Sequence, residues 1–415
     1  MARLARQHRV VVTGLGVLAP NGIGLDAFWR SLLKCKSGIG LITLFDSTDF
    51  PVRIAGEVKD FDIRKFVSGQ IKTHRLGRHT QLALAATYFA IKHAGLERAM
   101  LEACAPVPVI IGVSTSAIEV IERGKETMTT HGPSKVSPYI VSACQPHAIA
   151  SAISESLGIS TRATTISTAC PAGLDAVSIA VECIRDGKAE IAITGGADAP
   201  INPLTVACFG ATGLVPRNST NPEKLSRPFD RDRQGGILAE GAGILILENL
   251  EHALARGATP LAEIVGYGTS VDASGSLPAS GLEDSMSIAL ANAGCRPENI
   301  DYICAHGPSD PVLDKVETAC IKKTFGGHAY KIPVSSIKGV TGNPLAAAGP
   351  LELATCVMAI QQALVPPTAN YEHPDNDCDL DYVPLNPRKM DINKALINIH
   401  GLGNGNSTMI VGKVS

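Results

Sequence analysis

The segment TTISTACPAGLDAVSIAVECIR, residues 164–185, places a cysteine between an expected strand and an expected helix. The β-branched run before Cys170 predicts a buried strand, and apolar residues at helical spacing after Pro171 predict a helix. Proline suits the first helical turn, where its missing N–H costs nothing. Cys170 is therefore expected at the positive end of the helix dipole, which would lower a thiol pKa of about 8.5 and favour the thiolate. A nucleophile is one interpretation of Cys170, and a buried packing cysteine is the other.

A second pattern lies near the N-terminus, where residues 9–13 predict a buried strand that enters a glycine turn at residues 14–16. Together with Ala19, these glycines form a degenerate GxGxxA dinucleotide fingerprint. Pro20 interrupts the place where the phosphate-binding helix should start, and no strand ending in an acidic residue follows about twenty positions later. Nucleotide binding is therefore not expected.

The composition excludes several other classes of function. The 415 residues are 45% apolar, enough for a large core, and 37 basic residues balance 39 acidic ones, so neither a nucleic-acid nor a membrane partner is expected. Eleven cysteines without a CxxC pair argue against a disulfide framework or a metal site and for a reducing compartment. The basic N-terminus leads into a glycine-punctuated segment that is too short for a signal peptide or a membrane span. We expect a soluble cytoplasmic protein.

The elements that must position Cys170 alternate between strands and helices, which indicates an α/β fold whose buried sheets are covered by helices. Strands are expected at 52–58, 107–113, 189–194, 302–304, 334–336 and, as the last, 396–399; helices are expected at 25–33, 78–94, 149–157, 285–293 and 345–364. The charged run 250–260 is the best candidate for a boundary, and it divides the chain into halves at 1–253 and 254–415.

The second half contains a weak echo of the Cys170 segment. Residues 333–360, PVSSIKGVTGNPLAAAGPLELATCVMAI, also read as a strand, a small polar turn, a polar residue before proline and an Ala/Gly-rich helix. Asn343-Pro344 stands where Cys170-Pro171 stands in the first half. If the chain is a duplicated domain, two helix N-termini would meet at one site, one carrying a thiol and the other an amide.

Several motifs, in this order and spacing, resemble those of the β-ketoacyl-ACP synthases (ketosynthases). They are STACPAGLDAV (167–177), TGGADAPINPLTVACF (194–209), RPFDRDRQGGILAEGAG (227–243), AHGPSDPVLDKVET (305–318), VSSIKGVTGNPLAAAG (334–349), PPTANYEHPDNDCDLDYV (366–383) and GLGNGN (401–406). The GLDAV, VACF and CDLDYVP stretches look most like the ketosynthase α-subunit of type II polyketide synthases. The resemblance spans almost the whole chain. It implies a thiolase fold, with five layers in the order α-β-α-β-α and two similar halves.

The resemblance also implies a decarboxylative Claisen condensation on a Cys-His-Asn triad of Cys170, His306 and Asn343. Cys170 would take an acyl chain from a carrier-protein thioester, and the backbone N–H groups of Cys170 and Leu402 would form the oxyanion hole. A malonyl-carrier protein would lose CO₂, and its enolate would attack the acyl thioester. No bound cofactor is implied, because substrates travel on the phosphopantetheine arm of an acyl carrier protein.

Two further residues match a supporting role in the family. Lys338 and Glu317 are expected to pair with each other near the site. Surface positions are the ordinary alternative for such charged residues, but Lys338 lies in an otherwise uncharged turn. The positions predicted to gate the substrate or to face the pantetheine arm are Ser309, Asp310, Gly401, Leu402 and Gly403.

The sequence departs from the family pattern at positions inside these motifs, while the segments that form the scaffold keep the pattern. Asn343 stands where the family usually has its second histidine; an amide can donate to an enolate oxygen but cannot shuttle a proton. The usual His-Gly-Thr-Gly-Thr reads HGPSD at 306–310, which removes two hydroxyls and adds a carboxylate. Leu402 replaces the gating phenylalanine, with Asn404 after it in place of glycine. Gly236 replaces a common aromatic residue.

Three functions remain open at this point. The chain elongates a polyketide or unusual fatty acyl chain, or it transfers acyl groups between carrier proteins without decarboxylation, or it is a non-catalytic partner subunit. The last is disfavoured, because such partners typically lack the cysteine. The expected partners are the carrier protein and either a chain-length-factor-like subunit, as a heterodimer, or a second copy of the chain, as a homodimer.

Overall fold

The computed structural model describes residues 8–69, 71–217 and 219–415, and its strands trace the same path twice. In the first half the strands are β1 (Val10–Ala19), β5 (Val107–Gly112), β6 (Thr161–Ile166), β7 (Ile191–Asp198) and β8 (Gly241–Asn249). In the second half they are β9 (Ala262–Val271), β10 (Tyr302–Cys304), β11 (Val334–Ser335), β14 (Lys394–His400) and β15 (Gly405–Gly412). The sheet order is β6-β5-β7-β8-β1 in one half and β11-β10-β14-β15-β9 in the other.

Strand directions repeat as well. The strand β5 is parallel to β6 and β7, just as β10 is parallel to β11 and β14, while the remaining pairs in each half are antiparallel. A short antiparallel contact between β1 and β9 joins the halves into one eleven-stranded sheet. The duplication suggested by the echo of the Cys170 segment is therefore present in the topology.

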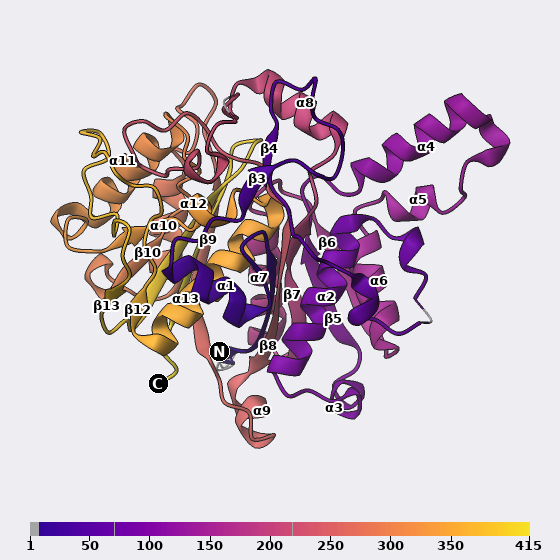
Figure 1. Cartoon of the computed structure of the whole chain (residues 1–415). Helices are drawn as coiled ribbons and strands as arrows, with labels where there is room; N and C mark the ends of the chain where they lie inside the picture. Colours follow the sequence, from indigo (N-terminus) through magenta and orange to yellow (C-terminus); the bar gives the residue numbers. More distant parts are fainter. Residues whose placement is uncertain (1–7, 70, 218) are drawn as a thin grey trace.

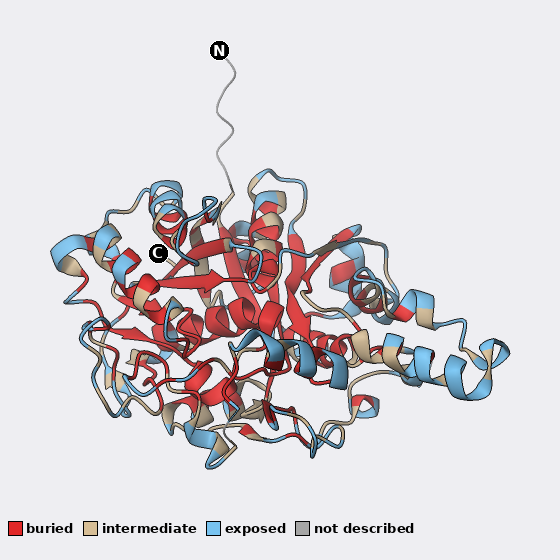
Figure 2. Ribbon diagram, turned by 90° about the horizontal axis from the view of Figure 1, so that it is seen from above, coloured by how far each residue is buried: buried red, intermediate tan, exposed pale blue. Residues whose placement is uncertain are grey.

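Helices form three layers around the two halves of the sheet (Figure 1). The central layer holds α7 (Ala172–Arg185) and α13 (Ala348–Gln362), which pack on each other and on β7 and β14. On one outer face lie α2 (Arg78–His93) and α6 (Ala148–Leu157), and on the other lie α10 (Leu282–Asn292) and α11 (Leu313–Phe325). This is the expected α-β-α-β-α arrangement, and Figure 2 shows the central layer as the most completely buried part of the molecule.

The remaining helices and short strands decorate this core. They are α1 (Leu25–Leu33), α3 (Arg98–Ala103), α4 (Ile118–His131), α5 (Ile140–Ala143), α8 (Pro203–Thr212), α9 (Leu250–Ala255), α12 (Lys338–Thr341), β2 (Gly22–Ile23), β3 (Ile39–Leu41), β4 (Ile54–Gly56), β12 (Leu364–Val365) and β13 (Arg388–Lys389). The helices α4 and α5 project away from the body of the molecule (Figure 1). All eleven cysteines are free. None of the described helices is both long enough and apolar enough to cross a membrane.

The glycines near the N-terminus do not make the expected turn, because both lie inside the single strand β1. A Cβ built on Gly16 would stand 1.8 Å from the carbonyl oxygen of Ala86, and one on Gly14 would stand 2.3 Å from that of Ala90. The glycines therefore allow α2 to pack directly against the strand. This packing, rather than a phosphate-binding turn, explains the pattern.

Two other strand predictions need correction. The strand before Cys170 exists as β6, but all six of its residues are exposed or half-buried because it forms one edge of the sheet. The strand predicted at 396–399 is not the last one, since the chain turns back after His400 and pairs as β15. A β-branched run fits both an edge and a central strand, so composition does not distinguish these positions.

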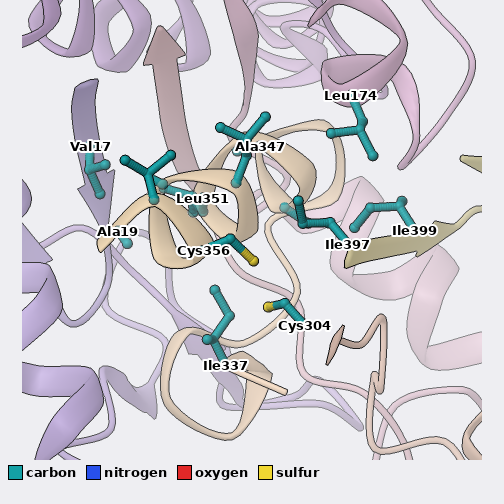
Figure 3. Close-up of a cluster of buried hydrophobic side chains, with 14 of the residues drawn as sticks. Val17, Ala19, Leu174, Cys304, Ile337, Ala347, Leu351, Cys356, Ile397 and Ile399 are labelled. Carbon is teal, nitrogen blue, oxygen red and sulfur yellow. The ribbon is translucent and has the colours of Figure 1, made fainter. Parts of the chain in front are cut away.

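The two helix starts that the sequence echo paired lie against each other. A Cβ built on Gly173, at the start of α7, would stand 2.1 Å from the carbonyl oxygen of Ala346, just before α13. In Figure 3, Leu174 of α7, Ala347 and Leu351 near the start of α13, and Ile399 of β14 gather in one buried cluster. This contact brings the carboxyl ends of β6, β10 and β14 toward one place, where the candidate site lies.

Candidate active site

A cavity of about 390 Å³ opens where the two helix starts meet. Its lining includes Cys170, Leu238, His306, Pro308, Asp310, Asn343, Leu345, His400, Gly401, Leu402, Gly403 and Asn404. The structure thus brings together most of the predicted residues from segments more than two hundred positions apart in the chain. The rest of the wall is largely apolar, with Phe209, Leu214, Val215, Ile237, Val312 and Leu313. Such a cavity suits a ligand with an apolar part and a reacting end.

Cys170 lies immediately before the helix α7 and is buried. Burial raises the pKa of its thiol to about 11, and nearby Asp198 adds to the rise. The charge of Lys338 and the backbone N–H groups of Leu402 and Cys170 lower the same pKa but do not offset burial. The predicted lowering of the thiol pKa by the helix dipole is therefore wrong, because burial outweighs it. At neutral pH the sulfur carries its proton, which must leave before it can attack.

The backbone next to Cys170 is strained. Ala169 has φ 61°, a left-handed conformation that non-glycine residues rarely adopt. Its carbonyl accepts a 3.0 Å hydrogen bond from the N–H of Ala172, which closes a tight turn before α7. Strain of this kind persists where surrounding structure imposes it and is concentrated at functional sites. Here it aims the Cys170 side chain into the cavity.

The glycine loop after β14 faces the same sulfur. A Cβ built on Gly401 would stand 2.9 Å from the backbone nitrogen of Cys170, so only glycine lets the loop approach so closely. The loop is closed by hydrogen bonds from Gly401 N–H to Gly405 O and from Asn404 N–H to Gly401 O, each 3.0 Å long. The N–H of Leu402 then points at the thiol, while its side chain is 52% exposed at the cavity mouth.

His306 follows β10 and is held through its backbone. Its N–H donates to Glu317 Oε1 at 2.9 Å, and the next N–H, of Gly307, donates to Glu317 Oε2 at 2.8 Å. Its carbonyl accepts a 2.6 Å hydrogen bond from Lys338 Nζ. Burial, helped by the charge of Lys338, holds the pKa of His306 well below 6.5, so the imidazole is neutral. The ring nitrogen Nδ1 is buried and has no hydrogen-bond partner within the described residues.

The predicted pair of Lys338 and Glu317 is not formed directly. Lys338 Nζ makes its ion pair with Glu352 of α13, and both side chains are almost fully buried. Glu317 is instead occupied by the two backbone N–H groups and by Asn398 Nδ2, 3.2 Å away. Both residues still support His306, one at its carbonyl and the other at its N–H. The sequence could not assign the partner, because Glu352 reads as an ordinary helical residue.

Asn343 is fixed in position by a short bridge to the segment before β8. Its N–H donates to Ile237 O at 2.7 Å, and its carbonyl accepts from Ala239 N–H at 3.0 Å. The side-chain oxygen Oδ1 is buried and, among the residues that the structure describes, has no partner. Buried polar atoms without partners are uncommon in native proteins. The site contains two of them, on His306 and Asn343.

The residues that depart from the HGTGT motif do not all face the cavity. Pro308 and Asp310 stand where the motif has threonine, and both line the cavity, whereas Ser309 stands where the motif has its second glycine. Ser309 is fully buried, and its hydroxyl accepts a 2.9 Å hydrogen bond from Arg227 N–H, so the predicted pantetheine-facing role of Ser309 is wrong. Asp310 does line the cavity, but its carboxylate accepts from the N–H groups of Val312 and Leu313 at the start of α11. The added carboxylate is therefore engaged with the helix start.

Sequence reasoning missed two residues of the site. His400 is buried at the end of β14 and lines the cavity, with its ring 6.1 Å from that of His306. Asp198, at the end of β7, accepts hydrogen bonds from the N–H groups of Ser114, Thr115 and Ala346 and so joins the two halves. The sequence does indicate His400, because a histidine between a predicted strand and a glycine turn is a candidate site residue. It does not indicate the link from Asp198 to Ala346, because that link crosses 148 positions.

Comparisons with known proteins agree with this geometry. A family model described as "Beta-ketoacyl synthase, N-terminal domain" matches residues 7–253, and its C-terminal counterpart matches residues 261–372. The chain is 39% identical to 3-oxoacyl-(acyl-carrier-protein) synthase 2 of Coxiella burnetii, over 98% of this chain and 99% of that one. It is 38% identical to the tetracenomycin polyketide synthase ketoacyl synthase alpha subunit of Streptomyces glaucescens, over 98% and 97% of the two chains.

Among solved structures, the ishigamide ketosynthase/chain length factor superposes with a TM-score of 0.91 at 33% identity, over 99% of this chain and 100% of that one. The expected thiolase fold is thereby confirmed. Both halves match the family models, the likeness to curated members runs from end to end, and Cys170, His306 and the glycine loop after β14 meet in one cavity. The chain belongs to the β-ketoacyl synthase family.

Proposed function

We propose that this chain catalyses the decarboxylative condensation of an acyl chain, held on Cys170, with malonyl-acyl carrier protein, and so elongates a polyketide or unusual fatty acyl chain. One observation carries the proposal. A buried thiol, a backbone N–H aimed at that thiol, and two polar side-chain atoms that have no partner among the described residues meet in a single cavity with largely apolar walls. The names of the relatives supply the substrate class, because they include a synthase of 3-oxoacyl carrier protein and a polyketide ketoacyl synthase.

In the first half-reaction, Cys170 Sγ attacks the thioester carbonyl of the acyl-carrier protein. The oxygen of the tetrahedral intermediate becomes negative and is stabilised by the N–H groups of Cys170 and Leu402. Collapse of the intermediate releases the pantetheine thiol and leaves the acyl chain on Cys170. Leu402 at the mouth of the cavity is the proposed gate, and Gly401 and Gly403 give its loop freedom to move.

In the second half-reaction, malonyl-carrier protein loses CO₂ and its thioester becomes an enolate. A neutral imidazole on His306 and the amide of Asn343 can each donate a hydrogen bond to the enolate oxygen. Glu317 and Lys338 keep the backbone of His306 in place. The enolate carbon then attacks the acyl carbon on Cys170, and the sulfur leaves as the chain grows by two carbons.

The edge strand β6 supports an assembly with a second subunit. Arg162, Ala163 and Thr164 are exposed in the isolated chain, and an open strand edge pairs readily with another. The second subunit is a chain-length-factor-like protein or a second copy of this chain. A cytoplasmic location and the division into halves at 1–253 and 254–415 remain predictions from the sequence.

The test follows the two half-reactions separately. Purified protein, alone and with a candidate partner subunit, is mixed with an acyl-carrier protein, and the mass added to Cys170 is measured, with Cys170→Ala as the control. Release of CO₂ from malonyl-carrier protein is then measured. Acylation without CO₂ release would favour the transferase alternative, which the amide at position 343 keeps open. No acylation from any carrier-bound donor would leave only the non-catalytic role.

The variant Asn343→Ala separates the roles of the amide. If the amide holds the enolate oxygen, decarboxylation falls by about 10- to 100-fold or more, while acylation of Cys170 changes much less. Equal losses in both steps would mean that Asn343 acts only through the structure of the helix start.

A further inference from the structure

His400 occupies a position from which it can take part in the chemistry. It is the last residue of β14, and the next residue, Gly401, contacts the backbone of Cys170. The ring lies 6.1 Å from the ring of His306, nearly perpendicular to it at 79°. The side chain is 5% exposed and lines the cavity together with Cys170 and Asn343.

The hydrogen bonds around His400 fix where its proton sits. Asn406 Nδ2 donates to Asp272 Oδ1 at 2.8 Å and to Asn404 O at 3.3 Å, which orients the amide with its oxygen toward His400. That oxygen lies 2.9 Å from His400 Nδ1. Because an amide oxygen can only accept, Nδ1 carries the proton of the neutral ring. The other nitrogen, Nε2, is then a free acceptor, and no residue of the described chain occupies it.

The remaining groups in the cavity are poor proton acceptors. The amide of Asn343 has no basic atom. His306 is buried next to the charge of Lys338, which disfavours its protonated form. The carboxylate of Asp310 accepts two backbone N–H groups of α11. The Cys170 thiol nevertheless has to lose its proton before it can form a bond with the acyl carbon.

We propose that Nε2 of His400 accepts the Cys170 proton during acylation, so that a second imidazole, from β14, replaces the one that position 343 lacks. The proposal rests on the acyl-transfer function proposed above. As the S–H bond breaks, the proton moves to Nε2 and sulfur bonds to the acyl carbon. When the C–S bond to pantetheine breaks, the proton passes from Nε2 to the departing sulfur. Atoms and charge balance, and no further reactant is needed.

The surroundings of His400 suit a ring that is briefly cationic. Asp272 Oδ2 lies 3.9 Å from Nδ1, close enough to stabilise the imidazolium. Asp272 is itself held by the N–H groups of Ala279 and Gly281, both 2.8 Å away. The ring of His306 is a second ionisable group near the ring of His400, at 6.1 Å between centroids. The chain Asp272–Asn406–His400 thus orients the base and accommodates its charge.

The experiment compares His400→Phe and His400→Gln with wild type and with His328→Phe. His328 follows α11 and is not among the residues that line the cavity, and its ring nitrogen Nε2 lies 3.3 Å from the carbonyl oxygen of Ile300. The first measurement is the rate of Cys170 acylation by acyl-carrier protein in a single turnover. The second is the alkylation rate of Cys170 by iodoacetamide at neutral pH, read on the Cys170 peptide, which needs no carrier protein. Two substitutions are used so that one folded variant is available.

Loss of a positioned base predicts that both His400 variants acylate Cys170 about 100-fold or more slowly, while His328→Phe matches wild type. The alkylation rate falls in the same two variants. In a third variant, His400→Ala, which leaves space for a free base, added imidazole raises the acylation rate at least tenfold, which a purely structural role of His400 would not allow. Wild-type rates of acylation and alkylation in both His400 variants would overturn the proposal. If wild type is never acylated but alkylation still depends on His400, the acyl-transfer function fails while the role of His400 stands.

Discussion

The contact between the starts of α7 and α13 predicts that Gly173→Ala lowers the stability of the protein, whereas helix propensity alone predicts that it raises the stability. Gly173 lies in the first turn of α7, where alanine is intrinsically about 1 kcal/mol more favourable than glycine. In this structure the added Cβ would stand 2.1 Å from the carbonyl oxygen of Ala346, far inside the ordinary contact of 3.4–4 Å. The obstacle is backbone, which cannot rotate away as a side chain can, so α7 and α13 must separate.

Overpacking of this kind costs about 1–3 kcal/mol, and a backbone obstacle belongs at the upper end of that range. After the gain in propensity is subtracted, Gly173→Ala is expected to lower the free energy of unfolding by about 2 kcal/mol. Urea denaturation measures the change. The matched control is Gly327→Ala, because a Cβ there meets nothing within 4 Å and the change should stay within about 0.5 kcal/mol. A Gly173→Ala protein as stable as wild type, or more stable, would refute the reasoning.

Two further predictions concern buried titratable groups. Lys338→Met leaves the Glu352 carboxylate buried without its partner and should lower the free energy of unfolding by about 3–5 kcal/mol. The double variant Lys338→Met, Glu352→Met should recover more than half of that loss in urea denaturation. A double variant as unstable as the sum of both single variants would contradict this prediction. Burial lowers the pKa of His79 to about 4, below its unfolded value of 6.5, so the unfolded chain binds more protons in this range and stability falls as pH falls. Between pH 7 and pH 5, wild type should lose about 2 kcal/mol more than His79→Leu, and equal losses would show that His79 does not drive the change.

The sequence was enough to predict the fold class, and it predicted that Cys170, His306 and Asn343 share a site, which the structure places in the lining of one cavity. The positions of Cys170 and Asn343 follow from local patterns, because a strand, a small turn and an apolar helix are consecutive around each, whereas the thiolase fold and the place of His306 follow from the family resemblance. Local patterns do not distinguish a glycine that forms a turn from a glycine that allows a helix to pack closely against a strand. Gly16 was expected in a turn and instead lies in β1 against the backbone of Ala86, a contact between segments about seventy positions apart.

The failures within the site have the same cause. The pairing of Lys338 with Glu317 was expected because both are charged and near His306, but the choice of Glu352 depends on how α13 crosses α12. The thiol pKa was predicted from the helix end alone. Desolvation by residues from both halves outweighs that effect, and nothing near Cys170 in the sequence indicates it.

The electrostatics around Cys170 and His306 indicate which charge the site stabilises. Lys338 lowers the pKa of Cys170, and it also lowers the pKa of His306, so its field favours an anion on sulfur and opposes a cation on that imidazole. Thiolate, tetrahedral oxyanion and enolate are all anions, and each would form in a cavity whose resting thiol and imidazole are neutral. The field of Lys338 therefore stabilises negative charge that forms only as the reaction proceeds. This is the condition for stabilising a transition state more than a ground state. On this reasoning an amide at position 343 suffices for the enolate, because a donor is needed there and a cation is not.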